Sequence, residues 1–237
     1  EVDTAYLSFI NEWREKLARD LVSRLDKNPW LLVNGQIDLL QLRAVVQRMI
    51  DRLVLMRFAE DHLVLPAGMI RSVHEMHVQS YLFDIDGMVD MMFRRFDEAH
   101  NSALFAYDLT DQASFSDEAL AGLALRLTEA RYRAMPADIL GNTYEQYLGK
   151  RLALEAGQVV TRDNLETRKK QGSYYTPQVI VRHLTDTTLG RCLYGTRNGR
   201  PDGEPLPGET RQTSADIRSL RVLDAACGSG SFLIYAY

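Results

Sequence analysis

The 237-residue sequence predicts a mainly α-helical protein, with a helical domain over residues 1–165 and the beginning of an α/β domain over residues 166–237. Three observations favour this arrangement. Apolar residues recur every three or four positions through the first part, Gly and Pro are sparse there, and one strand signal with a Gly-rich turn stands near the C-terminal end. With 46% hydrophobic and 25% charged residues, the composition is that of a globular protein.

The first part is expected to be all α-helical. Its first helix carries Ile10, Trp13 and Leu17 on one face, and Asn28-Pro29 interrupts the pattern. No strand alternation persists, and no internal repeat suggests a solenoid. The apolar periodicity predicts helices at about residues 4–25, 37–62, 70–84, 87–100 and 116–133.

No metal site is expected in this part. His74, Glu75 and His77 are too closely spaced for the His-Glu-x-x-His pattern of zinc proteases. Asp84 and Asp86 precede a glycine, but the later ligands of a calcium loop are missing. We interpret this second motif as a turn.

The second part opens with a charged stretch that leads into a helix. Thr176 suits the N-cap position and Pro177 the first helical position, while Gly190 is a natural stop. The buried face of this helix is expected to contain Val179, Ile180, Leu184 and Thr188. Residues 195–216 are rich in Gly, Pro and charge, which indicates a surface excursion or partial disorder.

The last segment predicts a strand, a tight turn and a helix. The strand runs from Leu220 to Asp224, and the turn contains Gly228 and Gly230, which can take positive φ and let the backbone approach a ligand. This is the first β-turn-α unit of a doubly wound sheet, which binds ligands at the carboxyl ends of its strands.

Three cofactors compete for this turn. ATP is disfavoured because Ser231 and Phe232 follow Gly230, where a P-loop has Lys and Ser or Thr. NAD is a weak candidate because Leu233 stands where a dinucleotide fingerprint has Gly or Ala. S-adenosylmethionine (AdoMet) needs only close backbone approach and a carboxylate near its cationic amino-acid end, which Asp224 could supply.

Two motifs resemble those of amino-methylating DNA methyltransferases. LDAACGSGSFL, residues 223–233, is similar to their AdoMet-binding motif and departs from it at Ala225, where the family usually has Pro. GSYYTP, residues 172–177, resembles the motif that covers the cofactor's methionine end in N6-adenine enzymes. Residues 48–66 and 139–152 resemble the helical segment before the methyltransferase domain of single-chain type IIG restriction-modification enzymes.

The resemblance implies a Rossmann-like AdoMet-dependent domain and a set of site residues. Cys227 is also expected to be a small packing residue, and Tyr174 and Tyr175 could instead be core aromatics. The implied cofactor-binding residues are Tyr174, Tyr175, Thr176, Pro177, Asp224, Ala226, Cys227, Gly228, Ser229 and Gly230. Arg168, Lys169 and Lys170, near Arg162 and Arg182, are weaker candidates for DNA phosphate contact, since such a run is usually a solvated loop.

The implied function is adenine-N6 methylation of double-stranded DNA in a bacterial restriction-modification or related defence system. Such an enzyme flips the adenine out of the duplex. Its Asn/Asp-Pro-Pro-Tyr/Phe motif is absent here, so the catalytic residues are expected beyond Tyr237 and the chain alone is expected to be inactive. The start at Glu1 suggests a piece of a longer protein, with room for a nuclease upstream and a target-recognition domain downstream.

Two other functions stay open. One is a non-catalytic helical connector or protein-interaction module, and the other is a methyltransferase that acts on RNA or protein. The net charge of −4 excludes only a protein that coats polyanions generally. Two distant cysteines, Cys192 and Cys227, and the lack of a long apolar run favour a cytoplasmic protein that does not span a membrane.

Overall fold

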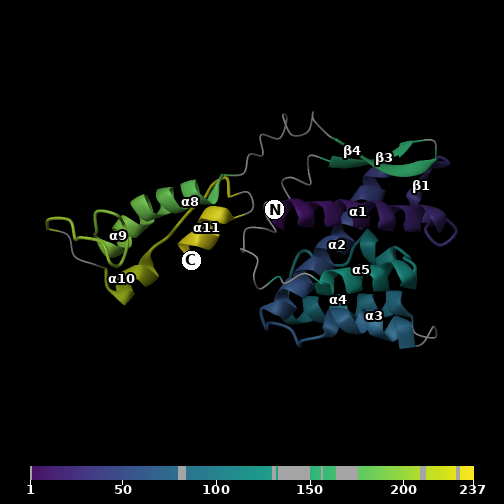
Figure 1. Ribbon diagram of the computed structural model, residues 1–237, viewed down its shortest axis with the longest axis horizontal. Helices are drawn as coiled ribbons and strands as arrows, with labels where there is room; N and C mark the ends of the chain where they lie inside the picture. Colours follow the sequence, from purple (N-terminus) through teal and green to yellow (C-terminus); the bar gives the residue numbers. More distant parts are fainter. Residues whose placement is uncertain are drawn as a thin grey trace. The chain divides into compact units, whose positions relative to one another are not determined.

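The computed structural model describes residues 2–79, 84–129, 132, 150–155, 157–163, 176–208, 212–227 and 230–237. Their contacts separate them into two compact units, the first ending at residue 163 and the second beginning at residue 176. The mainly α-helical prediction is confirmed, because helices account for most of the described residues (Figure 1).

The first unit contains the predicted helices. The second of them begins where Asp38 caps it, its carboxylate accepting from the amides of Leu40 and Gln41. Ser116 and Asp84 cap two others in the same way, so Asp84 starts a helix and the predicted turn there is wrong. The helices are α1 (Val2–Ser23), α2 (Leu39–Asp61), α3 (Met69–Gln79), α4 (Ile85–His100) and α5 (Asp117–Glu129), with 3-10 turns η1 (Pro29–Leu31) and η2 (Leu109–Gln112).

The prediction that the first part is all α-helical is wrong, because two antiparallel hairpins form. The short strands β1 (Leu32–Val33) and β2 (Gln36–Ile37) are joined through Asn34 and Gly35, both with positive φ. A tight Asn-Gly turn of this kind matches the twist of paired strands. The longer strands β3 (Lys150–Glu155) and β4 (Gln158–Asp163) meet across Gly157, whose φ of 79° suits a two-residue turn.

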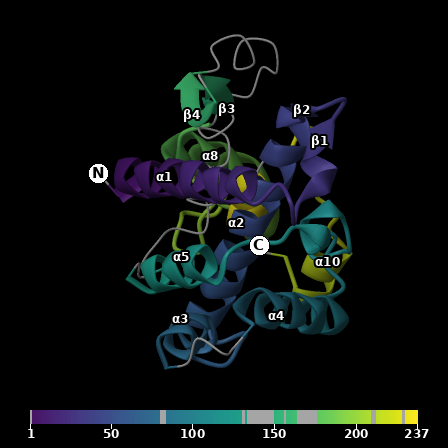
Figure 2. The same cartoon turned by 90° about the vertical axis from the view of Figure 1, so that its right-hand side faces the viewer.

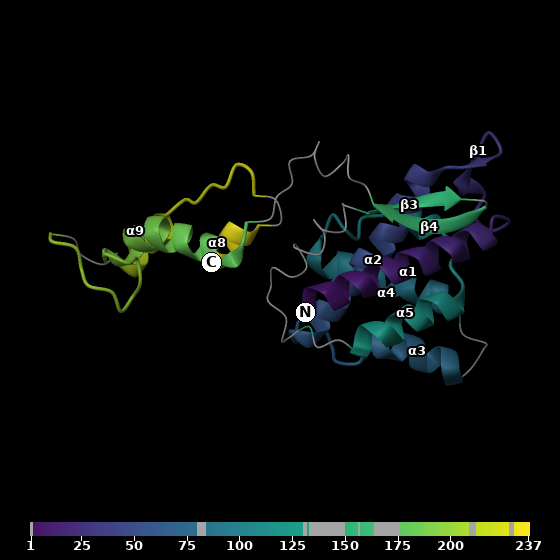
Figure 3. The same cartoon turned by 45° about the horizontal axis from the view of Figure 1, so that its top comes forward.

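Helices α1 and α2 hold the β3–β4 hairpin by side chains that bind its backbone. Arg14 donates to the Lys150 carbonyl at 3.4 Å, and Arg43 donates to the Leu152 carbonyl at 2.6 and 2.9 Å. On the other strand, Arg19 donates to Val159 O at 3.1 Å, and Glu15 accepts from Thr161 N at 2.7 Å. Figures 2 and 3 show the hairpin lying against α1.

The core of the first unit lies between α1, α2 and the helices that follow them. It is built from fully buried apolar side chains such as Leu17, Leu53, Val73 and Leu123. Asp20 of α1 fixes the start of α5, because its carboxylate accepts from both the amide and the hydroxyl of Ser116, at 2.8 and 2.6 Å. None of the described helices is long and apolar enough to cross a membrane.

The described residues of the second unit form four short helices and a π-helical turn. Its elements are α8 (Gln178–Thr185), η4 (Asp186–Gly190, the π-helical turn), α9 (Arg191–Tyr194), α10 (Ser214–Ser219) and α11 (Ser231–Ala236). The described residues of the stretch 195–216 are mostly exposed, as expected of a surface excursion, and they also pair locally: Thr196 forms a β-bridge with Pro205, and a capping box at Thr213 starts α10.

Candidate functional site

The backbone of the site is a helix that runs unbroken from α8 through η4 into α9. Gly190 was expected to end it, but this residue has helical φ and ψ of −60° and −37°. The helix ends instead at Gly195, which takes the left-handed conformation with φ 55°. Gly190 is needed for a different reason: a Cβ there would collide with the backbone carbonyl of Gly199, which packs directly against the helix.

Asp186, the first residue of η4, ties α11 to this helix. Its carboxylate accepts a hydrogen bond from the Tyr235 hydroxyl at 3.1 Å and pairs with the Arg200 guanidinium at 3.5 Å. The guanidinium of Arg182, one turn earlier on α8, lies 5.9 Å from the centre of the Tyr235 ring. Desolvation and the hydrogen bond to Asp186 raise the pKa of Tyr235 above its usual value.

In the turn before α11, the described glycine, Gly230, has the local geometry that the sequence predicts. Gly230 has φ 80°, and its amide donates to the Cys227 carbonyl at 2.7 Å. Asp224 closes the start of the turn, where its carboxylate accepts from Ala226 N at 3.1 Å. Asp224 therefore caps the turn, and its side chain is half-exposed.

A hollow of about 330 Å³ lies beside this turn, between the α8–η4 helix and α11. Figure 1 shows α8 and α11 side by side, and their described residues are in contact. The lining is apolar except for one carboxylate and two hydroxyls. Its residues are Thr185, Thr188 and Leu189 from the helix, Val222, Leu223, Asp224 and Ala225 from the chain before the turn, and Phe232, Leu233 and Ala236 from α11.

The strand predicted from Leu220 to Asp224 does not form. Residues 220–223 belong to neither of the two sheets that the described residues contain, and Val222 and Leu223 are exposed. A strand exists only when a neighbour accepts and donates its backbone hydrogen bonds, and no described segment pairs with this one. The feature that positions Asp224 is therefore an unpaired segment and the turn that follows it.

The predicted buried face of α8 is also wrong. Val179 is 72% exposed, Ile180 46% and Leu184 44%, whereas the neighbouring Val181 is fully buried. The periodicity correctly marked apolar positions, but it could not tell which of them a neighbouring element covers. Cys227, expected to be a small packing residue, is exposed as well.

Only part of the predicted cofactor site can be placed. Asp224 and its neighbour Ala225 reach the hollow, while Thr176 and Pro177 precede the first residue of α8, which lies about 10 Å along the helix axis from Thr185. Pro177 is itself the N-cap, one residue later than predicted, and no side chain caps this helix. Tyr174, Tyr175, Gly228, Ser229, Arg168, Lys169 and Lys170 lie outside the described residues.

The sequence interpretation did not find the threonines that line the hollow. Thr188 was assigned to a buried face, yet it is exposed, and its hydroxyl donates to the Leu184 carbonyl at 2.6 Å. The π-helical turn brings it and Thr185 to the hollow, because its wider winding changes which side chains share a face. Nothing in the run DTTLG announces a π-helical turn, and such turns are frequent at functional sites.

The lining has the chemistry expected of a site for part of AdoMet. Apolar walls suit a flat ring or a thioether chain, and the Asp224 carboxylate suits a cationic group. The volume is at the lower end of the roughly 300–1,000 Å³ of pockets that enclose a whole small ligand. Asp224 is the only acid among the lining residues, so a second carboxylate for a ribose would have to come from elsewhere.

Two curated bacterial proteins are similar to the chain. It is 24% identical over 244 aligned residues to the type II restriction enzyme and methyltransferase RM.Eco57I of Escherichia coli, in an alignment that spans 100% of the chain. It is 26% identical over 145 residues to the adenine-specific methyltransferase BrxX of Escherichia coli O9:H4 (strain HS), over 54% of the chain. The chain is a distant relative of bacterial methyltransferases.

The chain spans only a small part of these relatives, 21% of the length of RM.Eco57I and 12% of that of BrxX. No family model matches the chain, and no solved structure matches it significantly. The similarity to RM.Eco57I runs through both units, so the helical unit and the turn at Asp224 belong to one aligned stretch.

Proposed function

We propose that the chain is part of an AdoMet-dependent DNA adenine-N6 methyltransferase in a bacterial restriction-modification or related defence system. The observation that carries the proposal is the hollow at the Asp224 turn, which lies within the motif that resembles an AdoMet-binding loop. The distant similarity to RM.Eco57I and to the adenine-specific BrxX supports it independently.

In this proposal the second unit is the start of a Rossmann-like domain. Residues 220–223 would become its first strand once a neighbouring strand supplies backbone hydrogen bonds, and that sheet would cover the exposed Val179 and Ile180 of α8. In this proposal α8, η4 and α11 would supply part of the cofactor site. The part that orients an adenine amine would lie outside the chain.

Asp224 would hold the cationic end of AdoMet. Its carboxylate already accepts from Ala226 N at 3.1 Å, which orients it before any ligand arrives. AdoMet, when bound, supplies the electrophilic methyl group. The remaining proposed contacts are the aromatic rings of Tyr174 and Tyr175, residues Thr176 and Pro177, and the backbone of Ala226, Cys227, Gly228, Ser229 and Gly230.

Titration calorimetry with AdoMet tests the proposal in the longer enzyme of which we propose the chain is part. We expect Asp224→Asn to weaken AdoMet binding by about ten- to a hundredfold, since a hydrogen bond to a charged group contributes about 1.5–3 kcal/mol. Asp202→Asn, at an exposed loop residue of the same unit, is the matched control. An unchanged enzyme that binds no AdoMet would contradict the proposed function. If only the Asp224 variant is tested against it and the affinity is the same, Asp224 is not part of the AdoMet site.

A further inference from the structure

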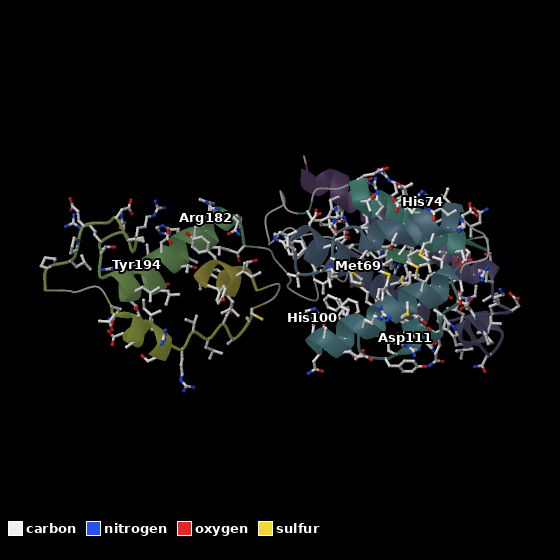
Figure 4. All side chains as sticks on the ribbon, turned by 90° about the horizontal axis from the view of Figure 1, so that it is seen from below. Met69, His74, His100, Asp111, Arg182 and Tyr194 are labelled. Atoms are coloured by element: carbon white, nitrogen blue, oxygen red, sulfur yellow. The ribbon has the colours of Figure 1, made fainter. Side chains whose placement is uncertain are left out.

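Five of the eight residues that line a hollow in the first unit are methionines. The hollow has a volume of about 590 Å³ and lies between α3 and α4. In the sequence, its residues are far from those of the hollow proposed to bind AdoMet. The chain contains eight methionines, and this one hollow takes Met69, Met76, Met88, Met91 and Met92. Figure 4 shows sulfur atoms of other side chains close to the labelled Met69. We call this feature the methionine groove.

Helical spacing turns the hollow into a groove between two helices. On α3, Met69 and Met76 are seven residues apart with Ser72 between them, so the three share one face. On α4, Met88 and Met91 share a face, and the small Gly87 widens the space beside them. The two helices are in contact, so these two faces form the walls of the groove.

The groove is open to solvent. Met91 is 47% exposed, and Met69, Met76 and Met88 are partly exposed, whereas Met92 is buried. These apolar side chains gather in one concave place rather than lying singly on the surface. Methionine is also the residue whose flexible, polarizable side chain lets such a surface adapt to a bound side chain.

The two ends of the groove carry opposite charge. Asp84 lines one end, whereas helical spacing places Asp86 and Asp90 on the opposite face of α4, away from the groove. Arg95 is exposed at the other end, one helical turn beyond Met91 on the same face of α4. A bound helix with basic residues in its first turn would place them, and its positive N-terminal dipole end, against Asp84.

We propose that the methionine groove binds an amphipathic helix of a partner protein, with apolar side chains at positions i, i+3, i+4 and i+7 and Lys or Arg at the end that meets Asp84. A helix fits better than a strand, because the groove walls are helices whose backbone groups are already paired and cannot accept a strand. Nucleic acid and anionic lipid do not fit an apolar groove with an acidic end.

Binding of two synthetic 18-residue peptides tests the proposal on the full 237-residue chain. Both peptides carry the same Leu stripe, but one has Lys and the other Glu on its polar face. With methionine methyl groups labelled with ¹³C, we expect the Lys peptide to shift the five groove signals and to leave those of Met49 and Met56, which are buried in α2, unchanged. The Glu peptide should bind at least tenfold more weakly.

Matched variants distinguish binding of the peptide in the groove from nonspecific binding elsewhere on the chain. Met88→Gln with Met91→Gln keeps side-chain length but removes apolar surface, and we expect it to weaken binding of the Lys peptide at least tenfold. Val78→Gln on α3 is the control, because Val78 is 64% exposed and does not line the groove. Unfolding by urea confirms that each variant is folded.

Several results would overturn the proposal. The groove signals could stay unchanged with the Lys peptide, both peptides could bind equally, or the double variant could bind like the unchanged chain. Groove signals that move with protein concentration alone would show that a second copy of the chain occupies the groove. That result would replace the proposed partner.

Discussion

The guanidinium of Arg52 binds the carboxylate of Asp111 through two parallel hydrogen bonds, with Nη1–Oδ1 3.1 Å and Nη2–Oδ2 3.2 Å. Arg52 is completely buried, and it also donates to the carbonyls of Leu104 and Ala106 at 2.9 and 3.0 Å. The guanidinium thus fixes the chain that joins α4 to η2 onto the middle of α2. A buried arginine fully paired in this way is costly to disturb.

Replacing Arg52 should destabilise the first unit strongly. Arg52→Met leaves the Asp111 carboxylate buried without its partner, and we expect a loss of about 3–5 kcal/mol in the free energy of unfolding. Urea denaturation measures it, with the exposed Arg71→Met as the control. The double variant Arg52→Met/Asp111→Leu should lose less than the single Arg52 variant, and a simple sum of two losses would contradict the role of the pair.

Stability should depend on pH through Asp86. Burial, and then the carboxylates of Asp90, Asp84 and Asp117, raise the pKa of Asp86 to about 7, opposed by a hydrogen bond from the Phe115 backbone. Because ionisation is harder in the folded state, this residue lowers stability progressively as the pH rises from about 4 to about 7.

Asp86→Asn should therefore stabilise the chain, since an amide oxygen can still accept from Phe115 and carries no charge. We expect a gain of about 2 kcal/mol at pH 8 that falls toward zero near pH 4. Urea titrations at several pH values measure it. A gain that is the same at both pH values would show that the pKa of Asp86 is not raised in the folded chain.

The β3–β4 hairpin should loosen when its clamp on α2 is removed. Arg43→Met deletes the two donors to the Leu152 carbonyl, a contribution of about 1.5–3 kcal/mol for a charged donor. We expect the amides of Ala153 and Val160 to exchange with deuterium about tenfold to a hundredfold faster. Arg151→Met, at an exposed position of the same strand, should leave exchange unchanged, and equal acceleration in both variants would contradict the clamp.

The basic cluster of Arg168, Lys169 and Lys170 stays a prediction from sequence. If these side chains contact DNA phosphates, changing all three to Ala in the longer enzyme should weaken binding across sequences and lower the salt slope by about two to three. Changing the exposed Arg71, Arg94 and Arg95 to Ala removes the same charge elsewhere and is the control. Equal effects in the two triple variants would assign the cluster to a solvated loop.

We also expect that the 237-residue chain by itself transfers no methyl group to DNA. Positioning of the reacting groups can supply roughly 7–11 kcal/mol of a barrier, and the chain lacks the sequence motif that would hold an adenine amine. Transfer of labelled methyl from AdoMet to unmethylated DNA measures it, beside a version extended through the rest of the proposed domain. Label in DNA from the short chain would show that its catalytic residues have been misplaced.

The local sequence pattern predicted the helices of the first unit well, because each of them buries apolar residues that recur every three or four positions. The hairpins were missed although their signals were present: Asn34-Gly35 is a strong turn signal, and Leu152, Leu154 and Val159 occupy the inner face of the β3–β4 ribbon. The strand at residues 220–223 failed for the opposite reason. Its apolar run was read correctly, but strand pairing depends on a distant segment that no local pattern reveals.

The site divides in the same way. Positive φ at Gly230 could be predicted, because only glycine takes that conformation without strain. The contribution of Thr185 and Thr188 could not, because it depends on the π-helical winding of η4. Nor could the sequence show that Asp186 would bind both Tyr235, which lies 49 residues further along the chain, and Arg200, which lies within the loop after α9.

The clamps on the β3–β4 ribbon also bear on how the protein behaves at high concentration. A two-stranded ribbon has two open edges, and an open edge is a template on which another chain can add a strand and begin to aggregate. Here the outward backbone groups of Lys150 and Leu152 on one edge, and of Val159 and Thr161 on the other, are already occupied by side chains from α1 and α2. At these positions the backbone groups are not free to pair with a strand of another chain, because the same four side chains that hold the ribbon in place already occupy them.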